Sequence, residues 1–78
     1  MSVKVISKDG CAYCEKAKDL LNEVGLPYVE VDATPPDSEV RVWFYNQGLK
    51  TFPQIWYGDH HIGGYEDLCD YVIEEGLI

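Results

Sequence analysis

The sequence predicts an α/β fold, in which a four-stranded mixed β-sheet is flanked by three helices in the order β-α-β-α-β-β-α. Short apolar runs of strand length alternate with longer segments of helical periodicity, and glycine or proline separates neighbouring segments. Towards the C-terminus two strand-like runs follow one another directly, which indicates a hairpin before a last helix. With 78 residues, the chain is expected to form a single domain, residues 1–78.

The N-terminal part is expected to form a strand, a helix and a second parallel strand. Residues 2–7 have the apolar character of a buried strand, and residues 27–32 form the second strand. The helix between them is expected from about Cys11 to Val24, with Gly25 at its end. Its apolar side chains recur at helical spacing: Ala17, Leu20, Leu21 and Val24. Tight turns on both sides of this helix make the unit a βαβ motif, so the two strands run parallel.

A second helix is expected after a proline-rich break at residues 34–38. Ser38 is a candidate for its N-cap, and Asp37 competes for that position. Apolar side chains then recur at helical spacing, and a glycine ends the run. The adjacent Trp43 and Phe44 are expected to pack together in the core against the sheet.

The C-terminal part is expected to form an antiparallel hairpin and a last helix. Residues 54–57 and 60–62 are the two strands, joined by a Gly-Asp turn. The helix is expected to begin near Tyr65, after two glycines, and to end at Gly76. The apolar face of this helix is Leu68, Cys69, Val72 and Ile73. Cys69 is expected to be a small buried hydrophobic residue.

Composition excludes several classes of function. Six basic residues against fourteen acidic ones give a net charge of −8, which argues against binding to nucleic acid or to an anionic membrane surface. No apolar run approaches the roughly 20 residues of a membrane span, and the N-terminus lacks the features of a signal peptide. Three cysteines are an odd number, a poor basis for a secreted disulfide framework. A reducing, intracellular setting is therefore expected, and so a cytoplasmic location.

Cys11 and Cys14 form a CxxC pair at the predicted turn from the first strand into the first helix. Backbone N–H groups at a helix start lack intrahelical partners and favour negative charge, which stabilises a thiolate. Lys8 adds a positive charge nearby. One thiolate can attack a foreign disulfide, and the neighbouring thiol can resolve the mixed disulfide that forms. The pair therefore indicates thiol–disulfide exchange.

A zinc site is the alternative interpretation of the same pair. A structural zinc site usually needs four ligands, and a second cysteine pair is missing. His60, His61 and Cys69 are the other candidate ligands, and they lie far along the chain. The two histidines belong to the predicted hairpin and are expected at the surface. No metal is expected.

Three motifs at characteristic spacing carry a resemblance to a known family. They are Cys11-Ala12-Tyr13-Cys14, Thr51-Phe52-Pro53-Gln54 and Gly63-Gly64-Tyr65-Glu66-Asp67. With the order of elements, they make the chain resemble a small dithiol glutaredoxin of the thioredoxin fold, of the bacterial or viral type. For the viral type, the expected location is the host cytoplasm. The resemblance implies an enzyme that uses glutathione to reduce protein disulfides and glutathione mixed disulfides. It also implies that Cys11 is the nucleophile and Cys14 the resolving cysteine. Ala12 stands where the family usually has proline.

The resemblance also implies a groove for glutathione beside the dithiol. Tyr13 would flank the substrate sulfur, and Pro53 resembles the family's cis-proline. Phe52 would offer its backbone N–H and C=O to the extended tripeptide, and Thr51 would add contacts at the rim. The family more often has valine at the position of Phe52; phenylalanine leaves the backbone pairing possible but brings a larger ring to the groove.

The last helix is expected to bind the γ-glutamyl end of glutathione. After Gly64, the amides of Tyr65 and Glu66 would bind the carboxylate, and Asp67 would bind the ammonium group. The alternative is that Glu66 and Asp67 only complement the helix dipole.

The glycine carboxylate at the other end of glutathione needs a cation. Lys8 is the first candidate. Arg41 is a weaker one, because the face that it occupies on the second helix is uncertain.

Two rival functions remain open at this point. A thioredoxin-like reductant served by a flavoprotein reductase would use the same dithiol, although the Trp-Cys-Gly-Pro-Cys pattern of thioredoxins is absent. A module that binds zinc or an iron–sulfur cluster is the other rival. Cluster binding stays open because Ala12 replaces the proline that the family usually has after the first cysteine, and loss of this proline sometimes permits cluster binding in the family. A monomer is expected, and ribonucleotide reductase is a protein substrate by family resemblance only.

Overall fold

The computed structural model describes residues 2–77, and its elements follow the expected order. The strands are β1 (Val3–Ser7), β2 (Tyr28–Asp32), β3 (Gln54–Tyr57) and β4 (His60–Gly63). The helices are α1 (Ala12–Glu23), α2 (Glu39–Asn46) and α3 (Tyr65–Glu74). The prediction of a four-stranded α/β fold with three helices is confirmed.

The four strands form one mixed sheet in the spatial order β2-β1-β3-β4. β1 is parallel to β2 and antiparallel to β3, and β3 is antiparallel to β4. Because β1 and β3 run in opposite directions, the chain leaves β1 and enters β3 at the same end of the sheet, where Ile6 lies opposite Gln54. The loop after β1 and the loop before β3 therefore meet.

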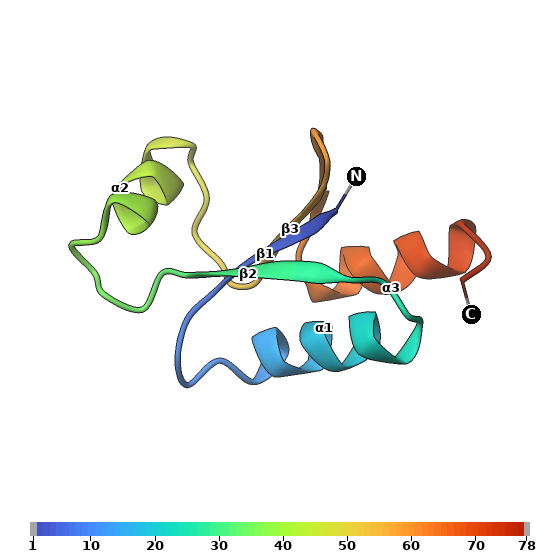
Figure 1. Cartoon of the computed structure of the whole chain (residues 1–78). Coiled ribbons are helices and arrows are strands. Elements are labelled where there is room, and N and C mark those ends of the chain that lie inside the picture. Colours follow the sequence, from blue (N-terminus) through green and yellow to red (C-terminus); the bar gives the residue numbers. More distant parts are fainter. Residues whose placement is uncertain (1, 78) are drawn as a thin grey trace.

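Helices cover both faces of the sheet: α1 and α3 lie on one side, and α2 lies on the other (Figure 1). Successive strand residues point to opposite faces, so Val5 belongs to the core under α1 and α3, whereas Ile6 belongs to the smaller core under α2. The larger core is formed by Val3, Val5, Ala17, Leu20, Leu21, Ile55, Leu68 and Val72. Within residues 2–77, no helix has the length and apolar character needed to cross a bilayer.

The ends of α1 and α2 follow the capping signals in the sequence. Val24 is the C-cap of α1, and Gly25 follows with φ of +76°, a conformation that glycine adopts without steric cost. Of the two candidates for the N-cap of α2, Ser38 occupies the position, and its Oγ accepts a hydrogen bond of 3.2 Å from the Arg41 amide.

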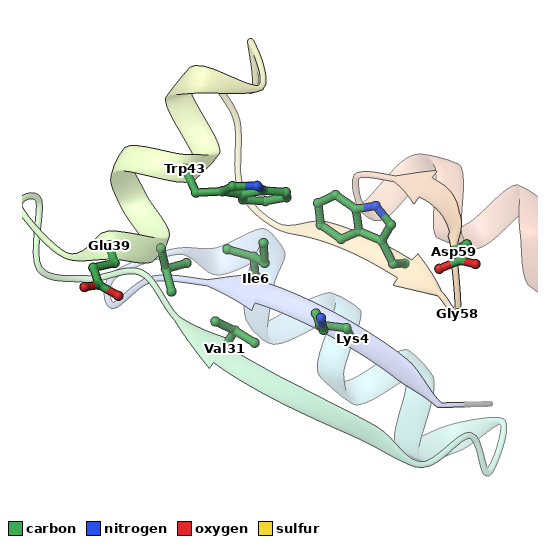
Figure 2. A pocket seen from close by; sticks show the side chains of 9 residues that line it. Lys4, Ile6, Val31, Glu39, Trp43, Gly58 and Asp59 are labelled. Atoms are coloured by element: carbon green, nitrogen blue, oxygen red, sulfur yellow. The ribbon is translucent and has the colours of Figure 1, made fainter.

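The prediction that Trp43 and Phe44 pack together in the core is wrong for Trp43. Phe44 is fully buried, but Trp43 is 45% exposed. Adjacent residues on a helix point about 100° apart, so the rings of Trp43 and Phe44 cannot both enter the core beneath α2. Trp43 instead lies at a hollow of about 500 Å³ between α2 and the sheet, 5.9 Å from the ring of Trp56 (Figure 2).

The predicted apolar face of α3 is also too wide. Leu68 and Val72, four residues apart, are fully buried, whereas Ile73 is 64% exposed and Cys69 is only half-buried. Leu68 and Val72 define the side of the helix that faces the core. Cys69 and Ile73 each directly follow one of these residues, so their side chains point away from that side. The expectation that Cys69 is a buried core residue is corrected accordingly.

Candidate active site

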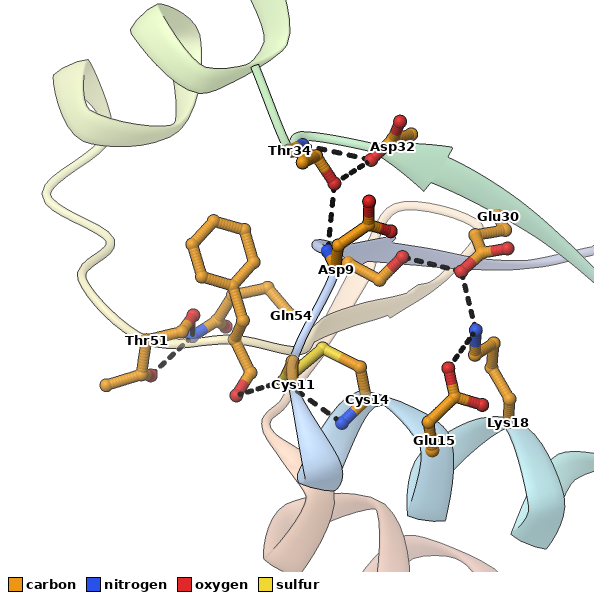
Figure 3. Close-up of a disulfide and its surroundings, with 12 residues drawn as sticks. Asp9, Cys11, Cys14, Glu15, Lys18, Glu30, Asp32, Thr34, Thr51 and Gln54 are labelled. Atoms are coloured by element: carbon orange, nitrogen blue, oxygen red, sulfur yellow. Dashed lines mark hydrogen bonds and ion pairs between the residues drawn. A yellow bond between two sulfur atoms is a disulfide. The ribbon is translucent and has the colours of Figure 1, made fainter. Parts of the chain in front are cut away.

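The two cysteines of the CxxC pair lie where β1 turns into α1. Gly10, with φ of +70°, redirects the chain after the strand, and Cys11 is the N-cap residue of α1 in an extended conformation. The structure holds Cys11 and Cys14 as a disulfide, with their Cα atoms 5.2 Å apart (Figure 3). The Cys14 amide donates to Cys11 Sγ at 3.2 Å, as a capping interaction. Cys14 is 1% exposed, whereas Cys11 is half-buried, so a partner molecule reaches the sulfur of Cys11 first.

The loop before β3 lies directly against this sulfur. The Phe52–Pro53 peptide bond is cis, as the resemblance to the family implies, and Pro53 is buried. The carbonyl oxygen of Phe52 lies 3.7 Å from Cys11 Sγ (Figure 3). A backbone edge is therefore within reach of any molecule that is bonded to Cys11.

A groove of about 530 Å³ brings most of the predicted binding residues together. It is lined by eight of the residues expected from the sequence: Tyr13, Thr51, Phe52, Pro53, Gly64, Tyr65, Glu66 and Asp67. The rings of Tyr13 and Tyr65, both part of this lining, are tilted against each other with centroids 5.9 Å apart. Leu49, Gln54, His61 and Gly63 also line the groove and were not predicted to do so.

One wall of the groove is the N-terminal turn of α3. Asp67 Oδ2 accepts a hydrogen bond of 3.0 Å from the Gly64 amide, so this carboxylate caps its own helix. Gly63 has φ of +120°, and a Cβ at this position would collide with the carboxylate of Asp67. The amides of Tyr65 and Glu66 occupy the first helical positions, which lack carbonyl partners within a helix. These amides are available to an anionic ligand.

Two cations converge on the ring of Phe52. Lys8 Nζ lies 5.3 Å from the ring centroid, and the guanidinium carbon of Arg41 lies 5.2 Å from it. The ring itself is stacked on buried Phe44, with centroids 4.3 Å apart and planes within 1°. Arg41 Nε also donates to the carbonyl oxygen of Ala33 at 2.8 Å. Arg41 therefore lies on the side of α2 that faces Ala33, the residue directly after β2.

Polar contacts hold the loop that carries Lys8 and Cys11. Thr34 Oγ1 accepts from the Asp9 amide at 2.8 Å and donates to Asp32 Oδ1 at 2.5 Å (Figure 3). The hydroxyl and amide of Thr34 both stabilise the carboxylate, which lowers the pKa of Asp32. The loop after β1 is thereby joined to the end of β2.

A second set of contacts fixes α1 to the sheet behind the dithiol. Glu30 accepts from the hydroxyl of Ser7 at 2.6 Å and from Lys18 Nζ at 2.9 Å (Figure 3). These two donors lower the pKa of Glu30, chiefly through the Ser7 hydroxyl, while Glu30 and Glu15 raise the pKa of Lys18. The ion pair links α1 to β2.

No cluster of three or more histidine, cysteine or acidic side chains that could hold a metal ion occurs in the part of the chain that the structure describes. His61, which was expected only as a surface residue, lines the groove and contacts Gln54. The signal that could have found it is the register of the hairpin, which places His61 opposite Trp56 and on the same face as Gln54.

A dithiol at a helix start, beside a cis-proline loop on a thioredoxin-like sheet, defines the class of the protein as a thiol–disulfide oxidoreductase. A family model described as Glutaredoxin matches residues 3–62. Glutaredoxin 3 of Escherichia coli (strain K12) is 33% identical over 76 residues, which cover 97% of this chain and 92% of that protein. The chain therefore belongs to the glutaredoxin family, and it is a glutaredoxin-type oxidoreductase with Cys11 and Cys14 as its dithiol.

Two further proteins are similar to this chain over most of its length. The hybrid peroxiredoxin hyPrx5 of Haemophilus influenzae is 39% identical over 70 residues, which are 90% of this chain but only 29% of that longer protein. Among solved structures, glutaredoxin 1 from Francisella tularensis, complexed with cacodylate, matches with a TM-score of 0.79 and 29% identity. That match covers 97% of this chain and 95% of the other.

Proposed function

We propose that this chain, as a single glutaredoxin domain, reduces glutathione mixed disulfides and protein disulfides with glutathione as the reductant. The observation that supports this most directly is the asymmetry of the dithiol. Cys11 is accessible and its Sγ accepts a hydrogen bond from a backbone amide, whereas Cys14 is buried behind it. Cys11 is thus the proposed nucleophile and Cys14 the proposed resolving cysteine.

The reaction with a mixed disulfide between glutathione and a protein needs one cysteine. The Cys11 thiolate attacks the glutathione sulfur, a Cys11–glutathione disulfide forms, and the protein thiolate leaves and is protonated. A second glutathione thiolate attacks the sulfur of the bound glutathione. Glutathione disulfide is released, and the Cys11 thiolate is restored.

The reaction with a protein disulfide needs both cysteines. Cys11 forms a mixed disulfide with the substrate, and the Cys14 thiolate attacks Cys11 Sγ and expels the substrate as a dithiol. Two molecules of glutathione then reduce the Cys11–Cys14 disulfide and become glutathione disulfide. Glutaredoxins have potentials of roughly −200 to −230 mV, which suit turnover by the glutathione pool of a reducing cytoplasm.

The proposed placement of glutathione follows the two ends of the groove. Its γ-glutamyl carboxylate accepts from the amides of Tyr65 and Glu66, and its ammonium group binds Asp67. Its cysteinyl residue pairs with the backbone of Phe52, which is already 3.7 Å from Cys11 Sγ through its carbonyl oxygen.

The glycine carboxylate of glutathione is proposed to bind Lys8. Arg41 supports this site electrostatically, because both cations lie at the ring of Phe52. The ring of Phe52 stacks on Phe44, which leaves the backbone of Phe52 as the part that pairs with the ligand.

The proposal is tested with two coupled assays on the same enzyme. One supplies glutathione, glutathione reductase and NADPH, and the other supplies thioredoxin reductase and NADPH. Turnover of a glutathionylated peptide is expected in the first assay and not in the second. Turnover with thioredoxin reductase alone would overturn the proposal in favour of a thioredoxin-like reductant.

A further inference from the structure

Gln54 connects the groove to β4 through a chain of side-chain hydrogen bonds. It is only 7% exposed, although it carries a polar amide. Its Nε2 donates to the carbonyl oxygen and to Oγ1 of Thr51, both at 3.1 Å (Figure 3). Its Oε1 lies 2.7 Å from Nε2 of His61. The buried amide is therefore satisfied on both sides by residues of the groove.

The donor and acceptor atoms of Thr51, Gln54 and His61 determine the direction of each of these hydrogen bonds. A carbonyl oxygen can only accept, so the NH₂ group of Gln54 must face Thr51 and the amide oxygen must face His61. His61 must then donate through Nε2–H. The neutral tautomer with its proton on Nε2 and the imidazolium form both provide this donor.

Stacking fixes the ring of His61 in the orientation that this hydrogen bond needs. The ring lies on the indole of Trp56, with centroids 4.4 Å apart and an angle of 18° between the planes. Trp56 is the residue opposite His61 in the β3–β4 pairing. His61 is therefore oriented by the sheet although it is exposed.

We propose that His61 is a positioning residue, which acts through Gln54 to hold the Thr51–Phe52 peptide in the orientation that binds glutathione. This inference rests on the proposed function, because it concerns the backbone edge that glutathione is proposed to use.

The planar geometry of the peptide bond transmits the effect of the His61–Gln54 hydrogen bond to the N–H of Phe52. The six atoms of the Thr51–Phe52 peptide are coplanar, and in a trans peptide the C=O and N–H bonds point in opposite directions. When Gln54 holds the carbonyl oxygen of Thr51, the N–H of Phe52 is directed away from Gln54. Loss of the His61 hydrogen bond leaves the buried oxygen of Gln54 without its partner. The Gln54 amide must then rotate or move toward water, and its hold on Thr51 weakens.

Two variants separate the hydrogen bond of His61 from its ring. His61→Phe keeps a ring on Trp56 and removes the donor, whereas His61→Gln keeps a donor of similar reach and removes the ring. His60→Phe is the matched control, because His60 is the preceding residue of β4, points to the opposite face and lies near Tyr71.

Steady-state kinetics with a glutathionylated peptide provide the first measurement. His61→Phe is expected to raise KM by about three- to tenfold, the effect of one net hydrogen bond, with kcat within about twofold. His61→Gln and His60→Phe are expected to keep KM within about twofold of the native value. An unchanged KM in His61→Phe, or an equal rise in His60→Phe, would overturn the inference.

The ¹H–¹⁵N resonance of the Phe52 amide provides a measurement that does not depend on turnover. It is expected to shift in His61→Phe and to return close to its native position in His61→Gln. An unshifted resonance in His61→Phe would also overturn the inference. If the native enzyme itself shows no glutathione-dependent turnover, the proposed function fails instead, whatever the variants do.

Discussion

Cys11 Sγ lies 3.7 Å from the carbonyl oxygen of Phe52, although 41 positions separate the two residues in the sequence. The antiparallel pairing of β1 with β3 produces this contact, because the loop after β1 and the loop before β3 meet at one end of the sheet. The proposed nucleophile and the backbone edge that is proposed to orient its substrate are thus held by the two central strands.

The roles proposed for the two cysteines predict different losses of activity in two variants. Cys14→Ser should retain reduction of glutathione mixed disulfides and lose reduction of protein disulfides, because only the second reaction needs the resolving thiol. Cys11→Ser should lose both. Turnover of a glutathionylated peptide and of a protein disulfide, measured side by side, checks this. An active Cys11→Ser enzyme would contradict the mechanism.

Asp67→Asn should weaken glutathione-dependent turnover through KM, by about tenfold, with little change in kcat. The variant loses the charge that is proposed to bind the ammonium group, but its amide oxygen can still accept from the Gly64 amide and cap α3. Attack on a small disulfide without a γ-glutamyl group should change far less. Equal losses on both substrates, or none on either, would mean that Asp67 serves only its helix.

Phe52→Leu should lower the free energy of unfolding by about 1–2 kcal/mol, because it removes the stacking on Phe44. Turnover with glutathione should stay within about threefold of the native value, since Phe52 is proposed to bind through backbone atoms. Urea unfolding and the coupled glutathione assay measure the two effects. A large loss of turnover in a folded variant would show that the ring itself contributes to the site.

Glu30 predicts a loss of stability in acid. Its pKa is lowered in the folded state, so its contribution is present above the ordinary value near 4.5 and is lost as the pH falls through the lowered value. The side chain is 42% exposed, so solvent screening limits the effect to at most about 1 kcal/mol. Urea unfolding at pH 3 to 7 should show a steeper decline for the native protein than for Glu30→Gln. Parallel declines would assign the acid sensitivity to other carboxylates.

The sequence was sufficient to predict the elements and most of the groove, because both depend on local signals. Glycines and Ser38 mark helix ends, and the cysteine and proline motifs mark the two loops that meet. The sequence was insufficient to predict where the side chains of Trp43 and His61 lie. Helical periodicity predicts which residues form the apolar side of α2, but not how the helix is rotated against the sheet. Only the pairing of β3 with β4 places His61 beside Gln54.

The position of Trp43 beside Trp56 has a consequence for measurements on this protein. The chain contains two tryptophans, and both belong to the hollow between α2 and the sheet. Intrinsic tryptophan fluorescence therefore observes α2 and the adjacent face of the sheet, and it does not observe the larger core under α1 and α3. If α2 separates from the sheet before the rest of the molecule unfolds, fluorescence will report a transition at a lower urea concentration than circular dichroism.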